Sequence, residues 1–464
     1  MKKILISFFA ASCFLGAECV TLKITCRSKG MELILLKSAI DEWIKKTGGE
    51  HKVEIITLPH ASNECFALYK QWLSAESFDV DILQMDVAWI GVFSDCLADL
   101  SDFFEPNDID EQDYFPAVRD SMYSNGKMVA LPLYTDCGIM YYRKDLLDKY
   151  KKPVPATWEE LYETAKYIQD EERKDPEKKN RFYGFVFQAK AFEILTCNFV
   201  EIVDSFGGAI ITNGKSTVDS DEVFRCVRFL IKCLNGICSR SVLNYSEEDA
   251  RGMFQSGNAV FMRNWPYAWS LMNDHNTVVA GKVGVFPIPP SCRGKKSSGV
   301  LGGWFMTVSK YSKHKKYAAD LIKFLTSKDQ QRIRSAHSYL PAFKSLYKDP
   351  EVLVSDPFFC SVRESLENAV SRPSTNFMKY YVKGSTEIFN TVNCILLDSV
   401  ELESAESVES AIRDKLKRLN RKLDDILQKV NCVGKENKGF LERMMEWLGF
   451  SDDEVGSDKK KAKS

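Results

Sequence analysis

The apolar and polar positions that follow residue 21 form short blocks with two different periods. Three compact β-prone runs predict strands, at residues 22–25, 53–58 and 79–86. The apolar positions between the first two runs recur at helical spacing: Leu33, Leu36, Ile40, Trp43 and Ile44. This helix is expected to stop at Gly48-Gly49. Alternating strands and helices wind a mainly parallel sheet with helices on both faces, so the pattern predicts an α/β fold.

A second unit of the same kind is predicted to open near Tyr134. The run LPLYTDCGIMYY predicts one strand, and PATWEELYETAKYI predicts a helix with Thr157 as its N-cap and Glu160 closing a capping box. Further on, WFMTV predicts a strand and residues 315–325 a helix, with the character of the first unit. This return predicts two lobes built from discontinuous segments, with a cleft between them.

The amino terminus has the order of a secretory signal peptide. Two lysines precede an apolar stretch at residues 4–15, and Gly16 and Ala17 follow it. We expect cleavage after Ala17, with lipid anchoring at Cys13 as the second alternative. No later stretch approaches about twenty apolar residues, so the mature protein is expected to be soluble outside the cytoplasmic membrane.

The carboxyl end differs in character from the rest of the chain. Residues 412–430 predict a charged amphipathic helix. Another helix is predicted by a second apolar face: Phe440, Leu441, Met444, Met445 and Leu448. We expect it to dock on its own lobe, with a membrane or a partner protein as the alternative.

The domain boundaries expected from these patterns are residues 1–17 for the signal peptide, 18–132 with 283–328 for the first lobe, 133–282 with 329–430 for the second lobe, and 431–464 for an extra helix and a charged, disordered tail.

Composition and motifs exclude several functional classes. Among 464 residues, 63 Lys and Arg nearly balance 64 Asp and Glu, and a net charge of -1 argues against nucleic acid as a partner. Fourteen cysteines contain no CxxC pair, so neither a zinc site nor any other metal site is expected. The stretch AIITNGKS at residues 209–216 loosely resembles a phosphate loop, but its Asn-Gly favours a hairpin turn. There is no HExxH and no GxSxG motif.

Carboxylates and aromatic rings remain at the ends of predicted elements. These residues are Asp86, Tyr134, Asp136, Trp265 and Tyr267 of NWPYAW, and Trp304 beside two glycines. Each alone is explained by a helix cap, a turn or core packing. Together they suit carbohydrate, because a pyranose packs its C–H faces on aromatic rings and its hydroxyls on charged groups.

Seven motifs resemble, in this order, the trehalose/maltose-binding branch of the family 1 extracellular solute-binding proteins: QMDVAWIG, LPLYTDCGIMYYRKDLL, YGFVFQAK, FMRNWPYAW, GKVGVFPIP, LGGWFMTVSKYS and the Arg-Pro of SRPS. Such proteins are the capture subunits of ABC sugar importers. The resemblance runs from about Leu22 to near Val430. It implies a type II-like periplasmic-binding-protein fold, with two lobes joined by a hinge and ligand in a central cleft, and neither enzymatic activity nor a cofactor.

Carried over onto this sequence, the resemblance also implies a set of substrate-binding residues. The acids that bind hydroxyls are Glu32, Asp86 and Asp136, the walls of the cleft are Tyr134, Trp265, Tyr267 and Trp304, Gly303 is a close backbone contact, and Arg372 is a guanidinium donor. The implied ligand is an α-linked disaccharide such as trehalose or maltose. The implied partner is an inner-membrane ABC permease with its cytoplasmic ATPase, met by a monomer in the periplasm.

The chain departs from the family pattern after VEIITL. Relatives usually carry polar or basic residues there, whereas this chain reads HASNECFALYK, and neither Cys65 nor Phe66 replaces an arginine. The identity of the sugar therefore stays open. Two alternatives remain: a glycoside hydrolase that acts on an oligosaccharide with paired carboxylates, and the same scaffold binding a glycerol phosphodiester.

Overall fold

The computed structural model describes residues 19–27, 30–59, 62–295, 299–355, 358–399 and 405–447, with backbone alone at residues 62–63, 354–355, 405–406 and 432–447. The predicted signal peptide, with Cys13, and the predicted tail after residue 447 lie outside the described residues.

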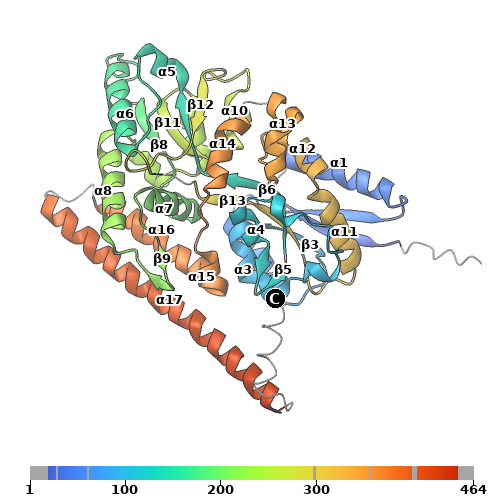
Figure 1. Ribbon diagram of the computed structural model, residues 1–464. Coiled ribbons are helices and arrows are strands. Elements are labelled where there is room, and N and C mark those ends of the chain that lie inside the picture. Colours follow the sequence, from blue (N-terminus) through green and yellow to red (C-terminus); the bar gives the residue numbers. More distant parts are fainter. Residues whose placement is uncertain are drawn as a thin grey trace, which may run out of the picture.

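The first sheet joins strands from three separate parts of the chain (Figure 1). Its order is β2 (Lys52–Thr57), β1 (Thr21–Cys26), β3 (Ile82–Asp86), β13 (Leu301–Val308) and β6 (Leu131–Cys137). β1 is parallel to β2 and β3, whereas β13 is antiparallel to β3 and β6. All eight residues of β13 are buried, as expected for a strand with a neighbour on each side and both faces covered.

The second sheet has four strands. Its order is β12 (Val283–Phe286), β7 (Ile139–Arg143), β11 (Ala259–Asn264) and β8 (Tyr183–Val186). β7 is antiparallel to β11 and β12, and β11 is parallel to β8. Every residue of β11 is buried, so the NWPYAW stretch begins at the end of a core strand.

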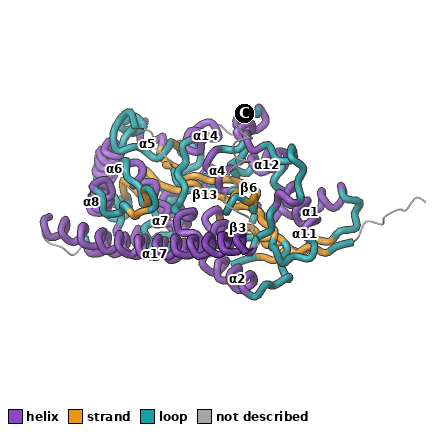
Figure 2. Tube along the Cα trace, turned by 60° about the horizontal axis from the view of Figure 1, so that its bottom comes forward, coloured by secondary structure: helices purple, strands orange, loops and turns teal. Residues whose placement is uncertain are grey.

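Helices surround both sheets and form two lobes (Figures 1 and 2). Around the first sheet lie α1 (Met31–Lys46), α2 (Ser62–Ser74), α3 (Ile90–Phe93), α4 (Pro116–Ser121), α11 (Lys315–Leu325), α12 (Lys328–Ser335) and α13 (Pro350–Ser355). Around the second lie α5 (Lys144–Lys149), α6 (Trp158–Glu172), α7 (Glu193–Ser205), α8 (Asp221–Gly236), α9 (Glu247–Gln255), α10 (Ala268–Met272), α14 (Phe358–Glu367) and α16 (Tyr381–Asp398). α15 (Ser374–Phe377) and α17 (Ala405–Trp447) complete the helices, and two short hairpins are β4–β5 (Tyr123–Ser124 and Lys127–Met128) and β9–β10 (Ile211–Thr212 and Lys215–Ser216).

The predicted single strand LPLYTDCGIMYY is wrong, because the chain changes sheet in its middle. β6 ends at Cys137 in the first sheet, and β7 begins at Ile139 in the second. Between them, a Cβ atom on Gly138 would lie 1.9 Å from Oε2 of Glu201 and 2.5 Å from Nη2 of Arg263. Only glycine leaves room for this buried ion pair at the crossing.

Three crossings between the lobes lie side by side. The Gly138 N–H donates to the Val300 carbonyl at 3.1 Å, and the Leu301 N–H donates to the Val370 carbonyl at 2.7 Å. The Val370 N–H donates to the Gly299 carbonyl at 3.1 Å. These hydrogen bonds join segments that are far apart in the sequence into one hinge region.

The strand pairing departs from the expected boundaries in two places. Residues 283–286, expected in the first lobe, form β12 and pair with β7 in the second sheet. α12, expected in the second lobe, belongs with the first, because the Gln331 side chain donates to the Pro132 carbonyl at 2.8 Å. Both departures have one cause: strand and helix periodicity does not record which neighbour an element pairs with.

The carboxyl-terminal expectation of two helices is also wrong, because residues 405–447 form one continuous helix. α17 packs on the second lobe through an apolar stripe of buried residues: Ile412, Leu416, Leu419, Leu423, Ile426 and Leu427. Ion pairs flank that stripe, including Arg413 with Asp221 at 3.1 Å and Lys422 with Glu387 at 2.7 Å. Figure 1 shows the helix running past the body of the lobe.

Two local predictions, the hairpin at residues 209–216 and the Thr157 cap of α6, are confirmed. AIITNGKS forms the β9–β10 hairpin, in which Lys215 pairs with Thr212. The Thr157 hydroxyl caps α6 by accepting from the Glu160 N–H at 3.2 Å. The cysteines that the structure describes are all free thiols, and most are buried. Within the described residues, no helix is long and apolar enough to cross a membrane, and no cluster of side chains could hold a metal ion.

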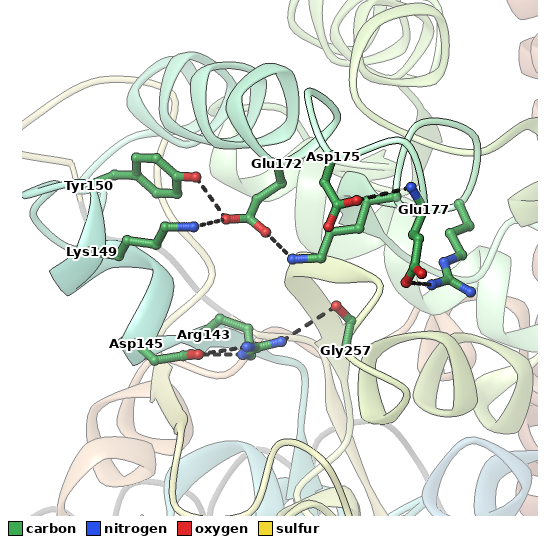
Figure 3. Close-up of polar contacts among 10 residues, drawn as sticks. Arg143, Asp145, Lys149, Tyr150, Glu172, Asp175, Glu177 and Gly257 are labelled. Atoms are coloured by element: carbon green, nitrogen blue, oxygen red, sulfur yellow. Dashed lines mark hydrogen bonds and ion pairs between the residues drawn. The ribbon is translucent and has the colours of Figure 1, made fainter.

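A charged network connects α5 with the end of α6 in the second lobe (Figure 3). The Glu172 carboxylate is buried at the end of α6 and accepts from Lys149 at 2.5 Å, from the Tyr150 hydroxyl at 2.7 Å and from Lys178. Burial alone would raise the pKa of Glu172, but these hydrogen bonds lower it to about 2. The network is structural, since it ties α5 and α6 together.

Candidate functional site

A cavity of about 320 Å³ lies between the two lobes. The residues that line it are Arg27, Glu32, Asp86, Tyr134, Asp136, Phe192, Glu193, Ile194, Cys197, Ser246, Glu247, Glu248, Trp265, Tyr267, Gly302, Gly303, Trp304, Ser338, Tyr339 and Arg372. All nine residues that the sequence singled out are among them. The first lobe supplies side chains from α1, β3, β6 and β13, and the second supplies those after β11 and on α7 and α9.

Glu32 enters the cavity from the first turn of α1. Its carboxylate accepts from the Gln84 side-chain amide and from the Tyr134 hydroxyl, the latter at 3.2 Å. Burial raises the pKa of Glu32, and the Gln84 hydrogen bond offsets part of that rise. The α1 helix and the end of β3 therefore hold one carboxylate in a fixed position.

Asp136 is the least compensated acid of the cavity. No hydrogen bond to its carboxylate is found among the described residues. Removal from bulk water, followed by repulsion from Glu32, raises the pKa of Asp136 to about 8, although Arg27 opposes that rise. Such a group has unused hydrogen-bonding capacity that points into the cavity, and a ligand hydroxyl would satisfy it.

Asp86 and Arg372 are already paired with each other. Arg372 Nη2 lies 2.5 Å from Asp86 Oδ1, and Arg372 Nη1 lies 2.9 Å from Glu193 Oε1 on α7. Asp86 also caps the turn that follows β3 by accepting from the Ala88 N–H at 2.8 Å. Asp86 therefore both caps this turn and pairs with Arg372, and the ion pair links the two lobes.

One polar atom of the Arg372 side chain can still donate a hydrogen bond. Its Nε is buried and has no hydrogen-bond partner among the described residues. Glu193, which holds its other side, also accepts from the Tyr381 hydroxyl and from Ser385 at 2.6 Å. The guanidinium is therefore held rigidly at the cavity wall, in the way that a preorganised donor requires.

Trp265 is positioned by three neighbours at the end of β11. The Asn264 side chain accepts from the Trp265 N–H at 2.8 Å, and the Tyr141 hydroxyl donates to the Trp265 carbonyl at 2.8 Å. The Arg263 guanidinium lies 4.2 Å from the centroid of the Trp265 ring and pairs with buried Glu201. One face of this ring is therefore fixed by a cation, and the ring edge reaches Gly302, where a Cβ atom would lie 3.0 Å away.

Tyr267 and Trp269, two positions apart, make different contacts. The Tyr267 hydroxyl donates to Glu248 at 2.5 Å, at the rim of the cavity. The Trp269 ring stacks on Phe358 instead, with centroids 5.1 Å apart. Trp269 is thus a packing residue.

Trp304 lines the cavity but is largely covered. Only 5% of the residue is exposed. The Arg27 guanidinium lies 4.5 Å from its ring centroid, and Trp89 packs edge-on against it at 5.8 Å. Next to it, Gly303 has a φ of 117°, and a Cβ atom there would lie 2.7 Å from the Tyr134 carbonyl. Gly303 is therefore required by the close approach of β6, whether or not a ligand touches it.

Sequence reasoning missed several lining residues, of which the most important are charged or aromatic: Arg27, Glu193, Glu247, Glu248 and Tyr339. Glu193, Glu247 and Glu248 read as ordinary acids of a first helical turn. Arg27 follows a predicted strand. This position at the end of a strand is the one sequence signal that could have identified Arg27 as a lining residue. The pKa of Glu247 is raised, first by burial.

The comparisons with known proteins agree with this geometry. Residues 40–357 match the family model described as bacterial extracellular solute-binding protein. A probable ABC transporter-binding protein of Deinococcus radiodurans is 39% identical over 395 residues, which cover 84% of this chain and 91% of that protein.

Solved structures show the same fold. The maltose-bound MalE3 protein of T. maritima superposes with a TM-score of 0.75 at 36% identity, covering 86% of this chain and 100% of that one. The GacH receptor of Streptomyces glaucescens superposes with a TM-score of 0.72 at 20% identity, covering 89% and 99%, and at that identity it supports the fold alone.

The family model and the close relatives describe binding proteins, so the glycoside hydrolase alternative is set aside. The two-lobed α/β fold that the sequence predicted is confirmed. By the length of the family match and by its identity to the Deinococcus protein, the chain belongs to the bacterial extracellular solute-binding proteins.

Proposed function

We propose that this protein captures an α-linked disaccharide, such as maltose or trehalose, in the periplasm. It then delivers the sugar, as a monomer, to an inner-membrane ABC permease that is driven by a cytoplasmic ATPase. The observation that carries this proposal is the interlobe cavity that gathers acids, aromatic rings and Arg372 from both lobes. The maltose-bound relative at 36% identity supports the class of ligand.

In the proposed complex, each group has a separate task. Trp265 and Tyr267 pack against the apolar faces of the sugar, while Glu32 and Asp136 accept from its hydroxyls. Asp86 and Arg372 take further hydroxyls, exchanging part of their mutual contact for contacts with ligand. Because these groups come from both lobes, the closed form gains contacts that the open form lacks, and ligand shifts the equilibrium toward closure.

The charge of the cavity disfavours a glycerol phosphodiester. Six acidic side chains line it, namely Glu32, Asp86, Asp136, Glu193, Glu247 and Glu248, against two guanidinium groups, Arg27 and Arg372. Asp136 is mostly protonated at neutral pH because its pKa is about 8, but the remaining acids still outnumber the guanidinium groups. A phosphate would meet net repulsion there, whereas a neutral sugar donates hydroxyl hydrogens to carboxylates.

Titration calorimetry with a disaccharide panel tests the proposal. We expect micromolar binding of maltose or trehalose without release of glucose. Asp86→Asn should weaken binding by about 10- to 100-fold, because a charged hydrogen bond contributes about 1.5–3 kcal/mol. Trp265→Ala should weaken it at least as much, by roughly 2 kcal/mol or more, as a central aromatic contact does.

The matched controls are Asp120→Asn on α4, whose carboxylate pairs with Arg119 at the surface, and Phe78→Ala, which removes an exposed ring. Both should bind as tightly as the wild type. Folded Asp86→Asn and Trp265→Ala proteins with wild-type affinity would show that the site is elsewhere, and glucose release would contradict the transport proposal itself.

A further inference from the structure

Arg27 is a cavity residue that none of the sequence motifs contains. It directly follows β1, and its backbone N–H donates to the Gln84 side-chain oxygen at 2.9 Å. The amide of the same Gln84 side chain donates to Glu32. Gln84 thus links Arg27 to the Glu32 carboxylate, at the end of the cavity that the first sheet forms.

The Arg27 side chain covers the face of Trp304. Its guanidinium carbon lies 4.5 Å from the ring centroid, and the Trp89 ring packs edge-on at 5.8 Å. With only 5% of Trp304 exposed, a pyranose could stack on that ring only by displacing the guanidinium. A guanidinium that stacks on an aromatic face keeps its N–H donors in its own plane, directed sideways to other acceptors.

The surroundings of Arg27 favour that position. Glu32, Asp136 and Glu247 lie close enough for its charge to favour their ionised forms. No lining residue within the described part of the chain comes from α2, where Cys65 donates to the Pro59 carbonyl at 3.0 Å instead of facing the cavity. Arg27 therefore supplies the cationic donor of this end of the cavity.

We propose that Arg27 is a specificity-determining residue, which takes the Trp304 face in place of the sugar and donates hydrogen bonds to hydroxyls of the sugar ring at the first-lobe end of the cavity. This inference rests on the proposed function. Recognition at this end is then by hydroxyl position and not by ring stacking, so ligands that differ in a single hydroxyl are discriminated there.

The test combines Arg27→Met, which keeps an unbranched apolar side chain over Trp304, with monodeoxy analogues of maltose and trehalose in calorimetry. Arg27→Met should weaken binding of the better disaccharide by about 10- to 100-fold, as expected when a charged donor is lost. For the analogue that lacks the hydroxyl facing Arg27, the wild type should lose at least about tenfold, and Arg27→Met less than about threefold. A role in packing alone would not produce this selective loss.

Arg27→Lys, which keeps the charge but not the planar fork, provides a second variant and should bind with intermediate affinity. Arg119→Met on α4 is the matched control and should bind like the wild type. If Arg27→Met and Arg27→Lys bind every sugar within about twofold of the wild type, the assignment of Arg27 is overturned and the proposed function stands. If the wild type binds no disaccharide, both fall.

Discussion

At the scale of single residues, carboxylates with the same chemistry have different electrostatic roles. Asp86 is paired with Arg372, and Glu172 is paired with two lysines and accepts a hydrogen bond from a tyrosine. Asp136 faces the cavity without such a partner, and the pKa of its carboxyl is raised to about 8. Electrostatically unfavourable groups of this kind are common at binding sites, because an uncompensated carboxyl is available to a ligand.

Asp136→Asn should stabilise the unliganded protein at alkaline pH and weaken sugar binding. Because the folded-state pKa of Asp136 is raised, its contribution to stability is fully present below about pH 4 and is lost as pH rises toward 8. The amide cannot ionise, so the variant should gain about 1–3 kcal/mol over the wild type near pH 9 and little near pH 5. Urea unfolding at both pH values measures this, and an equal gain at each would contradict the raised pKa.

Glu172→Gln should destabilise the second lobe without changing sugar affinity (Figure 3). The folded-state pKa of Glu172 is lowered to about 2, so its stabilisation is present above about pH 4.5 and disappears as pH falls toward 2. A loss of about 1–3 kcal/mol is expected at pH 7, shrinking in acid. Glu177→Gln is the control, since Glu177 is exposed and its ion pair with Arg181 is long at 3.7 Å. This variant should unfold like the wild type.

At the scale of elements, the hinge region and α17 depart most from the local pattern. The sequence through Gly138 has strand character without a break, yet its two halves belong to different sheets. At the crossing, Glu201 and Arg263 occupy the space beside Gly138. α17 runs without a break from Ala405 to Trp447, and its sequence contains no proline that would interrupt it.

Gly138→Ala should disrupt the hinge. The added methyl would lie 1.9 Å from Glu201 Oε2, so the buried ion pair must shift, and we expect a loss of about 1–3 kcal/mol together with altered sugar affinity. Gly252→Ala, inside α9 with no atom near its added methyl, should instead stabilise by about 0.5–1 kcal/mol. Thermal unfolding of both variants checks this, and equal melting temperatures would rule out the steric account.

Leu419→Ala in α17 should lower the free energy of unfolding by about 2–5 kcal/mol, because Leu419 is buried against the second lobe. Deletion of residues 431–464 should leave sugar affinity unchanged, since no described residue of α17 lines the cavity. Calorimetry on the shortened protein gives the answer. A large loss of affinity would assign the final segment a role in binding.

At the scale of the whole molecule, the cavity lies between two lobes that three neighbouring crossings of the chain connect. Asp86 and Arg372 meet across it at 2.5 Å, although 286 positions separate them in the chain. A ligand that inserts among these groups acts on the angle between the lobes. Under the proposed function, we expect opening and closing to be coupled to the occupation of the site.

Small-angle scattering should show this coupling. Saturating maltose or trehalose, whichever binds, should decrease the radius of gyration of the wild type, because bound sugar adds contacts in the closed form. The same sugar should leave Trp265→Ala unchanged at concentrations that saturate only the wild type. An unaltered radius in the saturated wild type would mean that binding occurs without closure.

The sequence by itself determined what depends on neighbouring residues. The Asn213-Gly214 turn, the Thr157 cap and the alternation of strands and helices were predicted because turn, cap and periodicity are local properties. The long motifs indicated the family, and all nine candidate residues line one cavity.

Only the tertiary structure decided what depends on distant partners. Gly138 divides a strand because of Glu201, β12 joins the second sheet because of β7, and Arg27 faces the cavity because of Gln84 and Trp304. None of these contacts leaves a periodic signal in the sequence, since each joins residues more than fifty positions apart. The sequence thus determined the elements and the family, whereas the packing of distant segments decided which side chains share the site.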